Sequence, residues 1–194
     1  MIRLAQATDV DACVVTFGRA FAEDPVMRWL FPGDDEYATD GRAVQRHLVH
    51  RFLALGSLWC TDDAVAMAGW IPPGRPEPDE EAVPAASIDH PAERIGRLIA
   101  LRNALAANEP PEPHWYLNIL GTHPDWQRRG LGAALMAEVF PRSERDGVPC
   151  YLETESTELV AYYRSHGFEV RSTWRPEPDG PPMWGMIRPV GSAA

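Results

Sequence analysis

The sequence predicts a single domain of the mixed α/β class, and three observations support this. The chain has 194 residues, which suits one domain with a core large enough to fold without disulfides or metals. Apolar residues make up 45% and charged residues 24%, an ordinary mixture for a globular protein. Segments with strand and helix patterns follow one another without a long βαβ series or a run of strands alone. We therefore expect residues 1–194 to form one α/β domain.

The N-terminal part predicts a strand, two helices and then a pair of strands. Pro25, Pro32 and Gly33 predict a break in regular structure between the two helices. The expected elements are a strand at 2–6, a helix at 9–22 after the capping signal Ala7-Thr8-Asp9, an irregular segment at 24–33, a helix at 39–55, and strands at 57–61 and 64–71. Residues 72–91 are rich in proline and acidic residues, so we expect an exposed loop there.

The C-terminal part alternates helices and strands. Pro141 has no N–H and would clash with the carbonyl of Ala137, so a helix that starts near residue 131 should kink or end there. On the helix at 92–107, the expected apolar face consists of Ile95, Leu98, Ile99 and Leu105. The expected elements are that helix, a proline-rich break at 108–113, a strand at 114–121, the helix from 131, a strand at 149–155, a helix at 157–167, and strands at 168–174 and 183–189.

The charge balance argues against one class of partner. Eighteen basic against 28 acidic residues give a net charge of −10. Nucleic-acid binding needs clustered Lys and Arg, so we expect no nucleic-acid partner and a weak attraction for small cations. The apolar runs are too short for a membrane span, and no secretory signal is evident. Three scattered cysteines, Cys13, Cys60 and Cys150, fit a reducing cytoplasm. We expect a cytoplasmic monomer or homodimer.

One short stretch, DWQRRGLGAAL at 125–135, suggests a phosphate-binding turn between a strand and a helix. Its two glycines allow close approach to the backbone, and its two arginines add charged donors. A plain glycine-rich turn with a basic surface is the alternative. The missing lysine excludes a nucleotide P-loop. A dinucleotide fingerprint is a weak rival, because Leu135 occupies the third glycine position although Glu153 lies near the position of the expected acid.

Two motifs favour coenzyme A over these nucleotides. The segment LGTHPDWQRRGLGAAL (120–135) resembles the acyl-CoA-binding motif of the GNAT N-acyltransferase superfamily, and AYYRSHGF (161–168) is similar to a second segment of that family. Further segments, GVPCYLETES and GPPMWGMIRP among them, resemble the puromycin N-acetyltransferase type over essentially the whole chain. The resemblance implies the GNAT fold, which is a mixed, mostly antiparallel central sheet with helices on both faces.

The resemblance also implies how acetyl-CoA would be held. Backbone N–H groups at the turn would bind its pyrophosphate, and main-chain atoms of the preceding strand would pair with its pantetheine arm. The implied residues are Arg128, Arg129, Gly130, Gly132 and Ala133 for the pyrophosphate, Gln127 at the opening of the turn, and Ile119, Leu120 and Gly121 for pantetheine. Gly121 suits a bulge that would separate this strand from its neighbour.

Acetyl transfer to an amine requires one proton to leave the amine and another to reach the thiolate. Tyr163 matches the family tyrosine that faces the sulfur, although it could also be a plain core aromatic; its neighbour Tyr162 is expected to point elsewhere. Glu153 is the leading candidate for the base. The alternatives are Glu155, His123, a carboxylate from the substrate side (Glu23 or Asp24), a water relay, or no catalytic role for any of these carboxylates.

Trp29 is expected to line the substrate pocket together with Glu23 and Asp24, from a loop after the first helix. His47 and His50 have helical spacing but no accompanying acid, so we expect no metal site.

These observations predict an acetyl-CoA-dependent N-acetyltransferase that acts on a primary amine of a small molecule, of antibiotic or amino-nucleoside type, by direct transfer in a ternary complex. Two alternatives remain: a protein N-terminal or lysine acetyltransferase, and a non-catalytic acyl-CoA-binding regulatory module.

Overall fold

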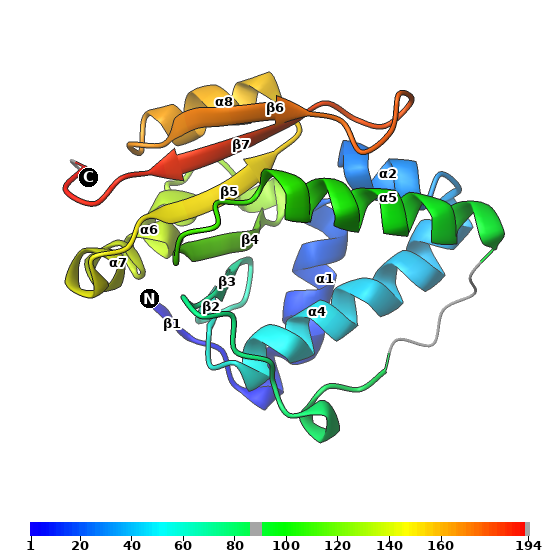
Figure 1. Ribbon diagram of the computed structural model, residues 1–194. Helices are drawn as coiled ribbons and strands as arrows, with labels where there is room; N and C mark the ends of the chain where they lie inside the picture. Colours follow the sequence, from blue (N-terminus) through cyan, green and yellow to red (C-terminus); the bar gives the residue numbers. More distant parts are fainter. Residues whose placement is uncertain (86–90, 193–194) are drawn as a thin grey trace.

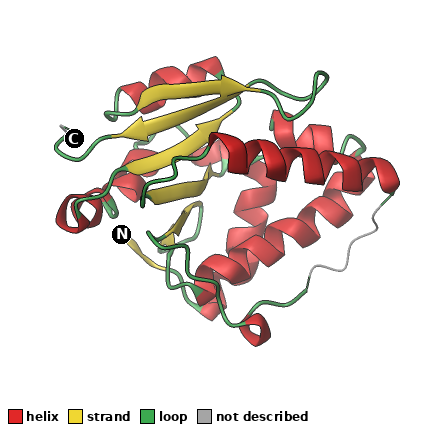
Figure 2. Ribbon diagram, in the orientation of Figure 1, coloured by secondary structure: helices red, strands yellow, loops and turns green. Residues whose placement is uncertain are grey.

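The computed structural model describes residues 1–85 and 91–192 and consists of a seven-stranded sheet with helices on both faces (Figures 1 and 2). The strand order is β1-β2-β3-β4-β5-β7-β6, and every neighbouring pair is antiparallel except the parallel pair β4–β5. The strands are β1 (Ile2–Leu4), β2 (Leu58–Thr61), β3 (Ala66–Ile71), β4 (Trp115–Thr122), β5 (Cys150–Thr154), β6 (Glu169–Trp174) and β7 (Met183–Arg188). The expected mixed, mostly antiparallel sheet is confirmed.

The helices divide between the two faces of the sheet. The first face carries α1 (Val10–Ala20) and α4 (Arg42–Ala54), with α2 (Pro25–Leu30) and α5 (Ala92–Asn108) packed beside them. The second face carries α6 (Leu131–Ala137), α7 (Phe140–Asp146) and α8 (Thr157–Arg164). A short α3 (Asp34–Glu36) and one π-helical turn at 37–41 lead directly into α4.

Alternating strand residues build a separate core on each face. Tyr116 and Tyr151 pack with α1 and α4, whereas their neighbours Leu117 and Leu152 pack with α6, α7 and α8. All six residues of β3 are buried, as expected of a central strand covered on both sides.

Proline sites account for the main differences from the expected elements. Pro25 starts α2 at the first helical position, where its missing N–H costs nothing, so the predicted irregular segment at 24–33 contains a helix. Pro141 does end the preceding helix, as predicted: α6 stops at Ala137, and Pro141 lies in the first turn of a new helix, α7. The predicted apolar face of α5 was partly wrong, because Ile95 and Ile99 are 42% and 47% exposed. That helix instead buries Arg94 and packs Leu98 toward α2.

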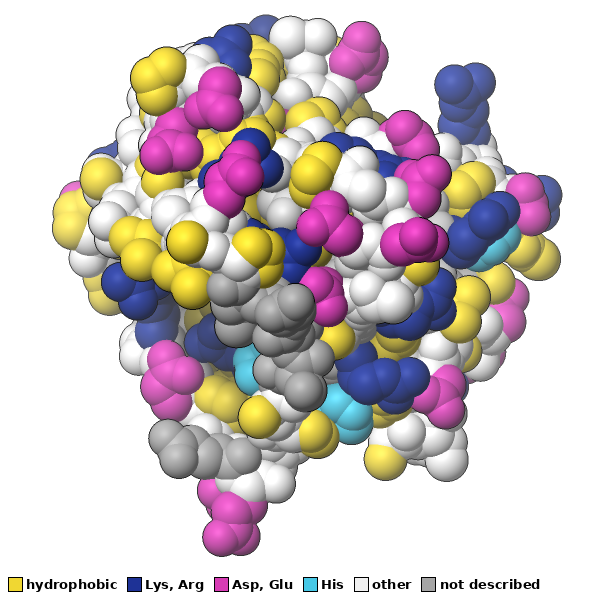
Figure 3. All heavy atoms as spheres, turned by 90° about the vertical axis from the view of Figure 1, so that its right-hand side faces the viewer, with side chains coloured by type: hydrophobic (Ala, Val, Ile, Leu, Met, Phe, Trp, Pro, Cys, Tyr) yellow, Lys and Arg dark blue, Asp and Glu magenta, His cyan; other side chains and the backbone are white. Residues whose placement is uncertain are grey.

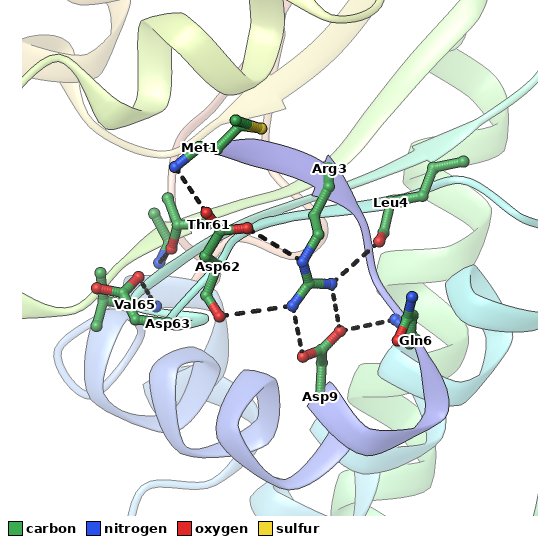
Figure 4. A network of polar contacts seen from close by, with 10 residues as sticks. Met1, Arg3, Leu4, Gln6, Asp9, Thr61, Asp62, Asp63 and Val65 are labelled. Atoms are coloured by element: carbon green, nitrogen blue, oxygen red, sulfur yellow. Dashed lines mark hydrogen bonds and ion pairs between the residues drawn. The ribbon is translucent and has the colours of Figure 1, made fainter.

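An ion-pair network fixes the first strand to the sheet (Figure 4). Arg3 donates hydrogen bonds to both carboxylate oxygens of Asp9, at 2.6 and 2.9 Å, and forms an ion pair with Asp62 in the β2–β3 turn. Asp9 also accepts a hydrogen bond from the backbone N–H of Gln6, so the same carboxylate fixes the backbone of the segment just before α1. These contacts join β1 and α1 to the turn after β2.

The strands β4 and β5 separate part-way along their length, and this separation positions the site. They pair only from Trp115 to Leu117 on β4, although β4 continues to Thr122. Next to the last pair, the β3–β4 register shifts so that Asn118 is an extra residue between Leu117 and Ile119. The prediction of a bulge at Gly121 was therefore wrong.

Gly121 has a different role in the fold. A Cβ added there would lie 3.2 Å from the ring of Phe21 and 3.3 Å from the Cβ of Ala20. Its lack of a side chain therefore allows the end of α1 to pack closely against β4.

Candidate active site

The turn before α6 presents a row of free backbone donors. Gly130 has a φ of 77° and Arg128 a φ of 60°, so the chain turns through the left-handed region on either side of Arg129. Ala134 is the first residue whose N–H bonds to a carbonyl of this helix, that of Gly130. Among the described residues, none accepts a hydrogen bond from the backbone N–H groups of 128–133. Clustered free N–H groups at a helix start are a binding site for phosphate-type anions.

A groove of about 520 Å³ lies over this turn and extends toward α8. Six of the residues predicted to hold the cofactor line it: Leu120, Gln127, Arg128, Gly130, Gly132 and Ala133. Three others do not. Ile119 and Gly121 face α1 on the opposite side of the sheet. The guanidinium of Arg129 lies over the Trp126 ring, 4.6 Å from its centroid.

The groove also contains residues that the sequence patterns did not identify as part of this site. These are Thr122, Trp126, Leu131, Leu159, Tyr162 and His166. The expectation that Tyr162 points elsewhere was wrong, since a Cβ added at Gly132 would lie 2.8 Å from the Tyr162 hydroxyl. The ring of Tyr162 also contacts that of His166 in a tilted arrangement, with centroids 4.5 Å apart. The glycine at 132 therefore leaves room for this tyrosine as well as for a ligand.

Tyr163 is held at the inner end of the groove by the geometry of α8. Ser156 caps this helix by accepting a hydrogen bond from the N–H of Leu159, and Gly167, with a φ of 84°, ends it so that Phe168 packs 5.8 Å from the Tyr163 ring. Tyr163 is 7% exposed, and its hydroxyl has no hydrogen-bond partner among the described residues. Burial raises the pKa of this phenol, and the nearby Glu155 raises it further. The hydroxyl is therefore a neutral donor that faces a groove.

Glu153 lies on the other face of the sheet, where it is mostly buried between two tyrosines. The Tyr151 hydroxyl donates a hydrogen bond to the carbonyl oxygen of Asn108 over 3.4 Å, and the Asn118 amide donates to the Tyr116 oxygen over 3.0 Å. Burial raises the pKa of Glu153 to about 7, against the opposing effect of the nearby Tyr116 and Tyr151 hydroxyls. The alternative of a solvated strand end does not describe this residue.

Two further carboxyls meet beside this point. Asp24 caps α2 by accepting the N–H of Met27 over 2.7 Å, and its carboxyl is close enough to that of Glu155, directly after β5, for the two to affect each other's pKa. Burial raises the pKa of both groups, and for Glu155, where the charge of Asp24 adds to the effect, it reaches about 9.

Comparison with known proteins identifies this arrangement. A model of the acetyltransferase (GNAT) family matches residues 61–168, which include β3, the groove, β5 and α8. The chain belongs to the GNAT acetyltransferase family. It is therefore an enzyme of the acetyltransferase class, and the fold implied by its two motifs is confirmed.

Solved GNAT structures match over nearly the full chain at low identity. A structure described as histone acetyltransferase HPA2 and related acetyltransferase from Corynebacterium glutamicum is 22% identical, with a TM-score of 0.71 and coverage of 100% of this chain and 98% of that one. The Drosophila melanogaster polyamine N-acetyltransferase is 15% identical, with a TM-score of 0.64 and coverage of 96% and 98%. The arylalkylamine N-acetyltransferase 2 of Aedes aegypti is 11% identical, with a TM-score of 0.68 and coverage of 98% and 99%. These likenesses show the fold.

The remaining predicted residues occupy varied places in this GNAT structure. Glu23 is exposed and forms an ion pair with Arg28 at 3.6 Å. Trp29 lies in α2, not in a loop, beneath the guanidinium of Arg97, and its indole N–H is buried with no hydrogen-bond acceptor in the described part of the chain. His123 accepts the N–H of Asp125 at the turn that follows β4.

The charge distribution and helix lengths bear on possible partners. Basic and acidic side chains are interspersed over the face of the molecule that lies on the right of Figure 1 (Figure 3). In the described part of the chain, no helix combines the length and apolarity that crossing a membrane requires. The same part contains no group of three or more potential metal-ligating His, Cys, Asp and Glu side chains.

Proposed function

We propose that this enzyme transfers an acetyl group from acetyl-CoA directly to a primary amine of a small molecule. One observation carries the proposal: a candidate base, Glu153, and a candidate acid, Tyr163, lie on opposite faces of the sheet beside the point where β4 and β5 separate. Direct transfer needs an acceptor on one side of a thioester and a proton donor on the other. Tyr163 lines the groove suited to coenzyme A, and Glu153 lies on the opposite face of the sheet.

The chain offers donors that fit this cofactor. Backbone N–H groups of 128–133 would hold the pyrophosphate, with Gln127 and Arg128 at the edge of the groove. Beyond Leu117, the edge of β4 that faces β5 no longer pairs with it, so main-chain groups near Ile119 and Leu120 would pair with the pantetheine arm. When bound, acetyl-CoA supplies the acetyl thioester.

The two candidate catalytic residues would divide the proton movements. With its pKa near 7, Glu153 is substantially ionised at neutral pH and can take a proton from the substrate ammonium, which frees the amine to attack the thioester carbonyl. Tyr163, whose raised pKa keeps it neutral, would give its proton to the sulfur as the C–S bond breaks. Burial is what brings the base to a suitable pKa, because it penalises the charged carboxylate.

Several observations support an amine of a small molecule as acceptor. Structures described as polyamine, agmatine and arylalkylamine N-acetyltransferases share the fold. Carboxyls, which favour a cation, surround the acceptor side of the candidate site. The resemblance to the puromycin N-acetyltransferase type favours an antibiotic or amino-nucleoside amine. The interspersed surface charge and three buried cysteines are compatible with a cytoplasmic enzyme.

The test is release of free thiol from acetyl-CoA in the presence of a panel of small primary amines and of peptides with free N-termini or lysines. We expect turnover on small amines and identification of the acetylated product by mass. Turnover on peptides alone would favour a protein acetyltransferase. Acetyl-CoA binding without turnover on any acceptor would favour a regulatory acyl-CoA-binding module and overturn the proposal.

A further inference from the structure

A second pocket lies at the end of β4 that is remote from the cofactor groove. It has a volume of about 180 Å³ and is lined by Leu55, Gly56, Ser57, Trp59, Pro72, Trp115 and Arg142. None of these residues lines the groove. Trp115 of the pocket and Leu120 of the groove are both on β4, where five residues of extended chain span about 17 Å. The pocket is therefore separate from the groove.

The basic side chain of this pocket has no acidic partner. Arg142, in α7, places its guanidinium over the ring of Trp59, 5.1 Å from the centroid. Within the described part of the chain, no carboxylate forms an ion pair with Arg142, and none of the lining residues is acidic. Asp146, one turn further along α7, instead accepts hydrogen bonds from Trp115 and Arg145, over 3.0 and 3.2 Å. Stacking on an indole uses the face of a guanidinium and leaves the N–H groups at its edge free for an anion.

A buried hydroxyl in the wall of the same pocket also lacks a partner. Ser57 is 4% exposed, and its Oγ has no hydrogen-bond partner among the described residues. The backbone of this residue is fully bonded, because its N–H donates to the Phe52 carbonyl and its own carbonyl accepts the N–H of Trp70. The position of Ser57 is thus fixed while its hydroxyl is unused. Buried hydroxyls normally have a partner, so this one indicates a ligand that supplies an acceptor.

We propose that this pocket binds a small organic carboxylate with a flat apolar body. The carboxylate would accept hydrogen bonds from the edge of the Arg142 guanidinium and from the Ser57 hydroxyl. The body would pack against the indoles of Trp59 and Trp115, which offer large apolar surfaces. An inorganic anion fits less well, because most of the wall is apolar and would leave its other oxygens without donors. The site is independent of the proposed acetyl transfer and does not rest on it.

The first test measures binding to the intact enzyme by calorimetry, with benzoate as the probe and two matched compounds beside it. Benzamide keeps the ring but loses the charge, and acetate keeps the charge but loses the ring. We expect saturable binding of benzoate, at least about tenfold tighter than that of either compound, because each lacks one of the two interactions. Equal affinity for benzamide or for acetate would overturn the inference, and so would the absence of saturable benzoate binding at millimolar concentrations.

The same titration with coenzyme A present at saturation tests where benzoate binds. Its affinity should be unchanged, because the pocket and the cofactor groove share no residue. Loss of benzoate binding would place the carboxylate at the donor-rich turn before α6 and would overturn the inference, while leaving the proposed acetyl transfer untouched.

The second test uses Arg142→Gln, Ser57→Ala and a control variant. We expect benzoate affinity to fall at least about tenfold in Arg142→Gln, which loses a charged donor, and about threefold to tenfold in Ser57→Ala, which loses a neutral one. Arg145→Gln, the same change on the same helix at a side chain that is 67% exposed, should leave the affinity unchanged. Unchanged affinity in both pocket variants would refute the assignment.

The stability of ligand-free Ser57→Ala separates a binding role from a structural one. Because the hydroxyl has no partner, its removal should leave the thermal unfolding temperature unchanged or raise it. A clearly lower unfolding temperature would show that the hydroxyl serves the fold, and this result would remove Ser57 from the site.

Discussion

Replacing Glu153 by Gln should lower activity and raise stability at the same time. Gln has nearly the same shape, and its amide oxygen can still accept a hydrogen bond from Tyr116 or Tyr151. The change removes the charge that burial penalises and also the group proposed to accept the amine proton. General-base catalysis contributes about 10²- to 10⁴-fold, so we expect kcat/KM to fall by about that factor.

The stability effect follows from the difference between the folded and unfolded pKa values. Glu153 has an ordinary pKa of 4.5 and a pKa of about 7 in the folded protein, so folding favours its protonated form. Below pH 4.5 the side chain is protonated in both states, and its burial carries no ionisation penalty. As the pH rises toward 7 the penalty grows, and above 7 it is complete. At about 1.4 kcal/mol per pH unit, this difference corresponds to about 3 kcal/mol.

Two measurements check this reasoning. Thiol release followed from about pH 5 to pH 9 should give a kcat/KM for the parent enzyme that rises through pH 7, and the variant should lose that rise. Urea unfolding should show the variant to be more stable than the parent at pH 8, with a smaller difference at pH 5. A variant that keeps the rate and the rise would refute the role of Glu153 as base. Equal stability of the two proteins at pH 8 would refute the ionisation penalty.

Three other substitutions test separate parts of the site and fold. Tyr163→Phe keeps the ring packing but removes the proposed acid, so kcat should fall about 10²-fold with little change in acetyl-CoA affinity; an unchanged kcat would exclude the role. Gly132→Ala places a Cβ 2.8 Å from the Tyr162 hydroxyl and should weaken acetyl-CoA binding, measured by calorimetry. Adding Tyr162→Phe should restore part of that affinity, and no restoration would mean that the clash lies elsewhere. Arg94→Met leaves two carboxylates of the α3–α4 region without their buried partner and should lower the free energy of unfolding by about 3 kcal/mol; a loss below about 1 kcal/mol in chemical denaturation would contradict this.

Local sequence signals predicted the turn before α6 and most of the residues that line the groove over it. Gly130 in the turn and Gly167 after α8 mark positions with positive φ, and such positions favour particular residue types in any sequence. A single stretch of chain therefore contains most of the donor-rich turn, which is why its residues could be named in advance. Pro25, the first residue of α2, was misread because a proline at the first helical position and a proline in a break look alike in a sequence.

The acceptor side was harder to predict because it depends on contacts between distant segments. Tyr151 lies two residues before Glu153 on the same strand, but nothing near Glu153 in the sequence shows that Tyr116, from β4, will lie beside it as well. Asp24 and Glu155 were both candidates for the base, but only the packing of α2 beside the end of β5 shows that they form a pair. The direction of the Tyr162 side chain could not be predicted from the sequence either; in the structure its hydroxyl reaches Gly132 across the groove.

The placement of these groups is itself an argument for function. Glu153, Glu155, Asp24 and Tyr163 all have their pKa values raised by burial, so each ionisable group is held where its charged form is disfavoured. Apolar residues of similar size would avoid that penalty, as they do at Leu152 in the middle of β5. Instead, the groups whose burial disfavours the charged form lie near the point where β4 and β5 stop pairing, and there the unpaired backbone of β4 can bind a ligand. Buried ionisable groups that gather at such an opening are characteristic of sites where proton transfer or cation binding requires them.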